Sequence, residues 1–235
     1  MRIGISTAMD SERAQIRSLL ENAREAGAYS VGAIGRNEVV LAATGIGKVN
    51  AAIGAVEMIR GWRPDCLVST GVAGGIDPSL GVMDVVAGAE VAYHDVDCGP
   101  ENEPGQVQGL PVWFAGDPAL LACAKDIRTE TKIAAGLICS GDQFISERDR
   151  LDDIKARYPD GLAVDMESGA LAQTCHIYGI PFLSFRILSD TPGAKDHFGQ
   201  YLNFWSTMAE RSFAVTKAFL ESIPPNLFSA YKEGM

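Results

Sequence analysis

The feature that most constrains the fold is an alternation of short β-branched runs with longer stretches of helical period. This alternation is typical of an α/β layer protein and not of a β-sandwich or a helical bundle. The strands are predicted at residues 2–6, 66–70, 84–94, 134–139, 162–165 and 182–188. The helices are predicted at residues 10–26, 49–62, 118–125, 147–157 and 168–178, with a closing helix of about 20 residues from Tyr201.

The remaining segments indicate a hairpin and a surface excursion. Residues 31–34 and 39–43 are predicted to pair around a turn that contains Gly35, and residues 98–109 are polar and rich in turn formers. No repeat, low-complexity tract or linker divides the chain. With 47% hydrophobic residues in 235, the chain can bury one core, so we expect a single domain spanning residues 1–235.

The overall charge argues against several classes of partner. The formal net charge is -10 and there is no block of basic residues, so neither nucleic acid nor an anionic membrane surface is an expected partner. No apolar run approaches the roughly 20 residues of a membrane span, and the segment MRIGISTAMD lacks the pattern of a secretory signal. We therefore expect a soluble, cytoplasmic protein.

The cysteines and histidines do not indicate a metal site. The five cysteines include no CxxC pair, which speaks against a disulfide framework or structural zinc and favours small core residues. The three histidines have no metal-binding spacing, and His197 is expected to lie in a loop.

Polar residues gather at four predicted strand ends, and each has a structural and a functional interpretation. In TAMDSE, Glu12 either suits the dipole of a helix N-terminus or acts as a general base. The glycines of STGVAGGID either turn the chain or let a ligand approach the backbone, and the segment matches neither a dinucleotide-binding nor an ATP-binding motif. In SGDQFI, Phe144 is either a core residue or a stacking surface for a purine.

The fourth strand end is RILSD, and a fifth stretch, AVDMESGALAQ, interrupts an apolar pattern with two carboxylates. Asp190 is either a turn residue or a carboxyl group that stays protonated in a dry site and acts as a general acid. Asp165 and Glu167 stand where a buried strand turns into a buried helix. We expect Asp165 to be a structural hydrogen-bonding partner without a catalytic role.

Together these motifs resemble the 5′-methylthioadenosine/S-adenosylhomocysteine nucleosidases of the purine nucleoside phosphorylase superfamily. The resemblance runs in order through MRIGISTAMDSE, GIGKVNAA, STGVAGG, YHDVD, SGDQFI, VDMES and RILSD, and covers nearly the whole chain. It implies a three-layer αβα sandwich around a mixed, partly closed central sheet, and a homodimer. The implied activity is hydrolysis of the N-glycosidic bond of 5′-substituted adenine nucleosides, with release of adenine. The candidate substrates are 5′-methylthioadenosine, S-adenosylhomocysteine, 5′-deoxyadenosine and aminofutalosine.

The resemblance also implies catalytic roles. Asp190 would protonate N7 of the adenine, Ser189 would orient the Asp190 carboxyl group, and Glu12 would activate the attacking water. This chemistry requires neither a metal nor an organic cofactor.

Binding roles follow from the same resemblance. Phe144 and the backbone of Ile145 would hold the base, whereas Glu167 would accept hydrogen bonds from the ribose hydroxyls. Met166 would pack under the sugar and Arg186 would assist Glu167. In addition, Met9 and Ile46 fit the channel for the 5′ substituent, which Phe198 or Tyr201 would close and to which a loop of the second subunit would contribute. The segment 93–113 is the expected subunit contact.

Two alternatives remain open at this point. Phosphorylases of this fold commonly carry an arginine and a serine around the glycine-rich turn, where this chain has Ser69, Thr70, Gly71 and Val72. Val72 also departs from the serine of some nucleosidases, and a position near the sugar is its expected role. The second alternative is a non-catalytic nucleoside-binding protein with the same fold.

Overall fold

The computed structural model describes residues 1–229, so the last residues of the predicted domain, 230–235, lie outside the described part. A ten-stranded sheet forms the centre, with the order β10-β6-β8-β9-β5-β1-β4-β3-β2, and β7 pairs with β6. The strands are β1 (Arg2–Thr7), β2 (Glu21–Ala26), β3 (Tyr29–Ile34), β4 (Asn37–Ala43), β5 (Cys66–Gly75), β6 (Val85–Tyr93), β7 (Trp113–Ala115), β8 (Ile133–Ser140), β9 (Gly161–Asp165) and β10 (Phe182–Asp190).

The sheet is mixed and closes on itself at one end. Strand β10 pairs with β5 in parallel and with β6 in antiparallel orientation. Strand β6 also pairs with β8, β8 with β9, and β9 with β5. Together with β10, these strands form a closed ring of five. The expected partly closed mixed sheet is therefore confirmed.

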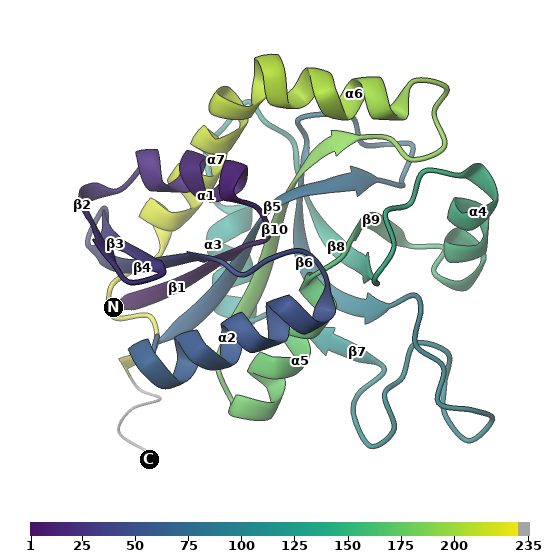
Figure 1. The fold of residues 1–235 in the computed structure, drawn as a ribbon, viewed down its shortest axis with the longest axis horizontal. Helices are drawn as coiled ribbons and strands as arrows, with labels where there is room; N and C mark the ends of the chain where they lie inside the picture. Colours follow the sequence, from purple (N-terminus) through teal and green to yellow (C-terminus); the bar gives the residue numbers. More distant parts are fainter. Residues whose placement is uncertain (230–235) are drawn as a thin grey trace.

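Helices cover both faces of the sheet (Figure 1). The helices are α1 (Asp10–Ser18), α2 (Lys48–Trp62), α3 (Pro118–Lys125), α4 (Arg148–Arg157), α5 (Ser168–Tyr178), α6 (His197–Asn203), a π-helix (Phe204–Met208) and α7 (Ala209–Ser222). Residues of α1, α3 and α7 pack with β1 and β10 in one core cluster, whereas residues of α2 and α5 pack in a second cluster. The chain therefore has the three layers that were expected.

The main error of the sequence prediction lies in residues 10–26. A single helix was expected there, but α1 ends at Ser18 and residues 21–26 form the edge strand β2, which pairs with β3. Apart from Asn22, the segment ENAREA consists of good helix formers, yet Asn22 has a φ of 51°, which a right-handed helix does not accommodate. Pairing with β3 overrides the local helix propensity in this segment.

Strands β5 and β10 and the closing helix, which contribute to the site, are longer than predicted. Strand β5 continues past Thr70 through the glycines to Gly75, and β10 continues to Asp190. The C-terminal helical segment begins at His197, not at Tyr201, and contains a π turn. The prediction that His197 lies in a loop is wrong, because His197 is the first residue of α6 and only 9% exposed.

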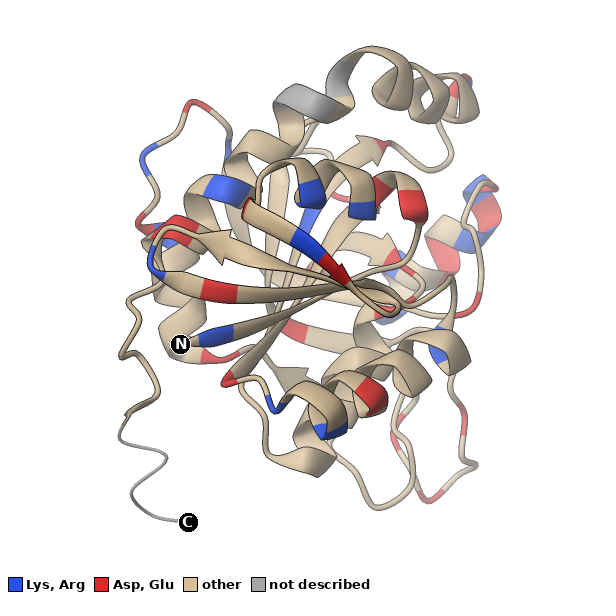
Figure 2. Ribbon diagram, turned by 60° about the vertical axis from the view of Figure 1, so that its left-hand side comes forward, with Lys and Arg blue, Asp and Glu red and all other residues tan. Residues whose placement is uncertain are grey.

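In Figure 2, Lys and Arg are interspersed with Asp and Glu over the visible elements. Within residues 1–229, no helix is both long enough and apolar enough to cross a membrane.

Candidate active site

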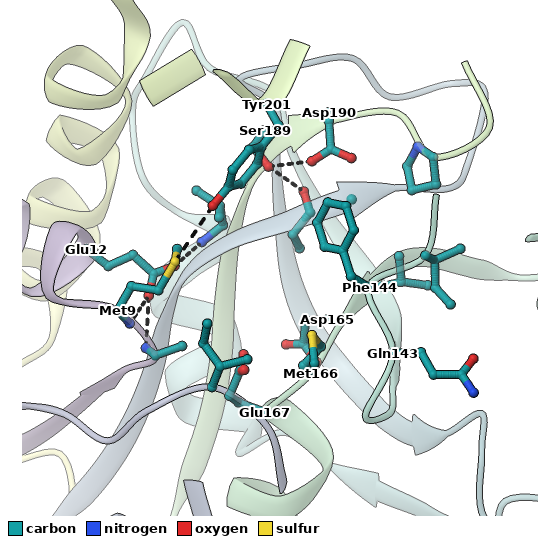
Figure 3. A pocket seen from close by; sticks show the side chains of 18 residues that line it. Met9, Glu12, Gln143, Phe144, Asp165, Met166, Glu167, Ser189, Asp190 and Tyr201 are labelled. Atoms are coloured by element: carbon teal, nitrogen blue, oxygen red, sulfur yellow. Dashed lines mark hydrogen bonds between the residues drawn. The ribbon is translucent and has the colours of Figure 1, made fainter. Parts of the chain in front are cut away.

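A pocket lies where the carboxyl ends of β1, β5, β9 and β10 meet (Figure 3). Every predicted site residue lines it except Arg186, which lies buried behind the carboxylates. The pocket also contains residues to which the sequence analysis gave no binding role: Ala8, Ala73, Gly74, Gln143, Val164, Asp165 and Pro192. All of them except Pro192 lie inside the quoted motifs, and Pro192 follows RILSD by two residues, so their place in the motifs was the available signal.

Glu12 is held in a cradle of backbone N–H groups. Its Oε2 accepts hydrogen bonds from the N–H groups of Ala8 (2.9 Å) and Met9 (3.0 Å), and its Oε1 accepts one from Val72 (2.9 Å). The residue is only 1% exposed, and burial raises its pKa, while Arg186 and the three N–H groups act in the opposite direction. A carboxyl group with a raised pKa accepts a proton more readily than an exposed one, as a general base must.

The glycine-rich turn makes this cradle possible. Gly71 has a φ of 150°, and a Cβ atom there would collide with Oε1 of Glu12. Val72 therefore serves Glu12 through its backbone N–H, while its side chain lines the pocket. The glycine permits close approach, but the group that approaches the backbone is a side chain of the protein itself.

Glu167 is the N-cap residue of α5 and is 6% exposed. Its Oε1 accepts a hydrogen bond from the N–H of Gly47 at 3.0 Å, and its Oε2 lies 3.5 Å from Nη2 of Arg186. Burial raises the pKa of Glu167 to about 7, with Arg186 opposing this shift and Asp165 adding to it. The pKa of this carboxyl group thus lies near neutrality.

Arg186 forms a buried ion pair with Asp165. Nε of Arg186 is 2.8 Å from Oδ2 of Asp165, and the two side chains are 1% and 2% exposed. Nη2 of Arg186 also donates to Oγ of Ser69 at 2.8 Å. Asp165 accepts further hydrogen bonds from the backbone N–H and the hydroxyl group of Ser168. Asp165 is therefore a buried hydrogen-bonding partner, as expected.

Asp190 ends β10 at the opposite side of the pocket. The register between β10 and β5 shifts between Leu188 and Asp190, and such an irregularity redirects the side chains next to it. Oγ of Ser189 donates to Oδ1 of Asp190 at 2.6 Å. Burial raises the pKa of Asp190, partly offset by the Ser189 hydrogen bond and by His197.

Aromatic side chains surround the region beside Asp190. Phe144 is 53% exposed, and its ring centroid lies 5.5 Å from that of His197 and 6.0 Å from that of Tyr201. Ile145 is buried beside it. A half-exposed phenyl ring over a pocket offers a flat face to a heterocycle and does not serve the core.

Tyr201, and not Phe198, lines the pocket. Its hydroxyl group lies 3.7 Å from Sδ of Met9, and Phe198 stacks on the outside of Tyr201 with 56% exposure. Ile46 lies at the pocket's rim and is 52% exposed. Of the two residues considered for the closure of the channel, Tyr201 is the one in position.

No metal site accompanies these groups. In the part of the chain that the structure describes, no three His, Cys, Asp or Glu side chains are grouped so as to hold a metal ion.

The fold and the arrangement of the site define a member of the phosphorylase superfamily, whose family model matches residues 2–221. A curated 5′-methylthioadenosine/S-adenosylhomocysteine nucleosidase from Chromohalobacter salexigens is 42% identical over 202 residues, which cover 83% of this chain and 86% of the relative. The enzyme of the same name from Bacillus subtilis is 38% identical over 212 residues, covering 86% and 92%.

Solved structures agree with this assignment. The nucleosidase from S. pneumoniae with the transition-state inhibitor MT-ImmA has a TM-score of 0.89 at 33% identity and covers 95% of this chain and 100% of its own. The S-adenosylhomocysteine nucleosidase from Streptococcus pyogenes, in complex with 5-methylthiotubericidin, has a TM-score of 0.88 at 33% identity, covering 95% and 98%. The chain belongs to the 5′-methylthioadenosine/S-adenosylhomocysteine nucleosidase family and is an N-glycosidic hydrolase.

Proposed function

We propose that this pocket hydrolyses 5′-methylthioadenosine and S-adenosylhomocysteine to adenine and the 5′-substituted ribose. The observation that carries the proposal is that two buried carboxyl groups, Asp190 and Glu12, line one pocket in different surroundings. Hydrolysis of a glycosidic bond needs one acid on the leaving group and one base on water. Two different environments can give the two carboxyl groups these separate roles.

Asp190 is proposed as the acid. Its raised pKa favours the protonated form, and the hydrogen bond from Ser189 to Oδ1 fixes the orientation of the carboxyl group. Protonation at N7 converts adenine from a poor leaving group into a neutral one. The aromatic ring of Phe144 and the backbone of Ile145 would hold the base beside Asp190.

Glu12 and Glu167 are proposed to act on the sugar side. As the bond breaks, the ribose acquires positive, oxocarbenium-like charge, so carboxylates on this side stabilise the transition state more than the ground state. Glu12 would take a proton from water, and the three N–H groups around it support the charged form that this role needs. Glu167 would accept hydrogen bonds from the ribose hydroxyls, with Met166 under the sugar and Arg186 steadying Glu167.

The 5′ substituent would lie among Met9, Ile46 and Tyr201. The thioether of Met9 and the side chain of Ile46 offer an apolar surface to an alkylthio group, and the Tyr201 hydroxyl group adds one polar atom. 5′-Deoxyadenosine and aminofutalosine are the further candidate substrates. A kinetic comparison of the four nucleosides would establish the preference.

Water is favoured over phosphate as the nucleophile. Neither lysine nor arginine lines the pocket, and the guanidinium group of Arg186 is 1% exposed and paired with Asp165. An anion such as phosphate needs charged donors to replace its hydration. We expect adenine to be released from 5′-methylthioadenosine in phosphate-free buffer. Release only after phosphate is added would assign the chain to the phosphorylases.

Binding without turnover is the second alternative. The presence of Glu12, Glu167 and Asp190 in one pocket argues against it. Calorimetry that detects binding of 5′-methylthioadenosine, with no adenine formed over several hours, would favour this alternative.

A homodimer is proposed as the working assembly. Helices α2 and α5 lie side by side (Figure 1), and both carry exposed apolar side chains, including Ile53 (54% exposed) and Ile177 (61%). Trp113, at the end of the predicted contact segment 93–113, is 47% exposed. Such a surface suits a second copy of the chain. Light scattering at micromolar concentration should give the mass of a dimer, and the mass of a monomer would contradict this assignment.

A cytoplasmic location is proposed as well. All five cysteines are unpaired, as is usual in a reducing compartment. Fractionation of cells that express the protein should recover it with the cytoplasmic markers, and recovery with an exported fraction would refute the proposal.

Replacing Glu167 by glutamine should remove a pH dependence of stability. The pKa of Glu167 is about 7 in the folded state, against 4.5 for an exposed glutamate in the unfolded chain, so the folded state binds the extra proton between these pH values. The free energy of unfolding should therefore fall as pH rises from 4.5 to 7, by about 3 kcal/mol for this group. Urea unfolding at pH 5 and pH 8 should show a smaller decrease for Glu167→Gln than for the wild type. Equal decreases for both proteins would contradict the prediction.

A further inference from the structure

The floor of the pocket has more negative than positive charge. Three carboxylates face one guanidinium group: Glu12 from α1, Asp165 from the end of β9 and Glu167 from the start of α5 surround Arg186 of β10. Each of the four residues is at most 8% exposed. Because water is excluded, charges interact strongly here. The choice of the carboxylate that pairs with Arg186 therefore sets the pKa values of the other two carboxyl groups.

Arg186 pairs more closely with Asp165 than with Glu167. The Nε–Oδ2 distance is 2.8 Å, whereas the closest approach to Glu167, from Nη2 to Oε2, is 3.5 Å. Asp165 is itself held by Ser168, whose hydroxyl group lies 2.7 Å from that of Ser184. With 2% of its side chain exposed, Asp165 has almost no surface to offer a substrate. Asp165 can therefore act on the reaction only through its charge, which acts directly on Glu167, and through its ion pair with Arg186.

We propose that Asp165 is a positioning residue that binds the Arg186 guanidinium group at 2.8 Å, so that Arg186 stays 3.5 Å from Glu167 and both Glu167 and Glu12 remain available to the ribose and to water. This proposal rests on the roles proposed above for Glu167 and Glu12. If the charge of Asp165 is lost, Arg186 becomes a buried cation whose nearest anion is Glu167. Since arginine does not give up its proton in proteins, the guanidinium group would then move closer to Glu167 and occupy its carboxylate.

The surroundings offer Arg186 and the carboxylates few other charged partners. Strand β5 contributes the hydroxyl group of Ser69 to Arg186, and the loop before α2 contributes the N–H of Gly47 to Glu167. Beyond the cluster, the charge of Asp165 acts on His94 after β6 and on Cys139 of β8. Asp190 and His197 interact with each other at the base end of the pocket.

The direction of the effect on Glu167 follows from these contacts. The charge of Asp165 raises the pKa of Glu167 and that of Arg186 lowers it. Removing the first charge also releases the second, so both changes lower the pKa of Glu167. In a plot of kcat/KM against pH, activity falls on the acid side as the carboxylates become protonated, and we call this fall the acid limb. The acid limb should then move to lower pH.

The test compares kcat/KM for adenine release across pH in the wild type and in Asp165→Asn. The asparagine keeps the size of the side chain and removes its charge. We expect the acid limb of Asp165→Asn to lie about one pH unit lower, with KM raised several-fold because Arg186 occupies Glu167. An unchanged acid limb, whatever the loss of activity, would reduce Asp165 to a structural residue and overturn the proposal.

Two variants separate charge from structure. Ser184→Ala breaks the hydrogen bond to Ser168 but changes no charge, so its acid limb should stay at the wild-type pH even if the protein is less stable. Asp165→Glu retains the charge and should keep the acid limb close to its wild-type position. A shift in Ser184→Ala as large as that in Asp165→Asn would also overturn the proposal.

A measurement on the wild-type enzyme covers the case in which Asp165→Asn does not fold. Carbon-13 labels on the aspartate and glutamate carboxyl groups show which group takes up the proton near pH 7. Uptake by Glu167 is the expected result, and uptake by Asp165 would overturn the proposal. These comparisons hold whether water or phosphate is the nucleophile, so a failure of the proposed hydrolysis and a failure of this inference are separate outcomes.

Discussion

Replacing Asp190 by asparagine is expected to lower kcat for adenine release about 100-fold or more. The amide keeps the shape of the carboxyl group and can still accept the hydrogen bond from Ser189, but it cannot transfer a proton to N7. Burial maintains the raised pKa that makes Asp190 suitable as an acid, so no exposed carboxyl group can easily replace it. The measurement is the steady-state rate of adenine release from 5′-methylthioadenosine.

The leaving group provides the control for this variant. The control substrate is the nitrophenyl glycoside of 5-methylthioribose, whose leaving group, nitrophenolate, is stable without protonation. Asp190→Asn should therefore lose much less activity on this glycoside than on the nucleoside. Ser189→Ala should show a smaller loss on the nucleoside, since it removes only the hydrogen bond that orients the acid. Near-wild-type turnover of 5′-methylthioadenosine by Asp190→Asn would show that N7 receives its proton from another group.

The parts of the fold that were predictable from sequence carry local signals. Helix α3 was predicted with its observed bounds, and in the structure Asp117 caps it and Pro118 is its first residue. Helix α5 was likewise predicted in full, and it ends before Gly179, which adopts the left-handed conformation. Strand β2 could not be predicted, because its pairing with β3 decides its conformation and its own residues favour a helix.

The same distinction holds for the site. The roles of Glu12, Glu167 and Asp190 were predicted from the ordered resemblance of their motifs to the nucleosidase family, because each carboxylate alone also has a structural interpretation. His197 was missed because its burial and its position beside Phe144 depend on how α6 crosses the pocket. The roles of Gly71 and Val72 were also beyond the sequence, since a Gly-rich turn does not reveal whether a ligand or a side chain approaches it.

Replacing Glu12 by glutamine is expected to lower kcat about 100- to 1,000-fold while leaving substrate affinity almost unchanged. Glutamine cannot take a proton from water. Its NH2 group would also meet a backbone N–H, either that of Val72 or those of Ala8 and Met9, because all three cradle groups are donors. The measurement pairs kcat from adenine release with the Kd of 5′-methylthioadenosine from calorimetry.

Glu167→Gln is the matched comparison, because it changes the same chemical group on the same side of the pocket. Glu167 is proposed to hold the ribose hydroxyls, so its variant should weaken substrate binding as well as catalysis, whereas Glu12→Gln should affect catalysis alone. If Glu12→Gln binds substrate poorly but turns over bound substrate at the normal rate, Glu12 would be the residue that binds the ribose, and Glu167 the candidate for activating water. The separation of kcat from Kd between these variants therefore tests which carboxylate acts on water and which on the sugar.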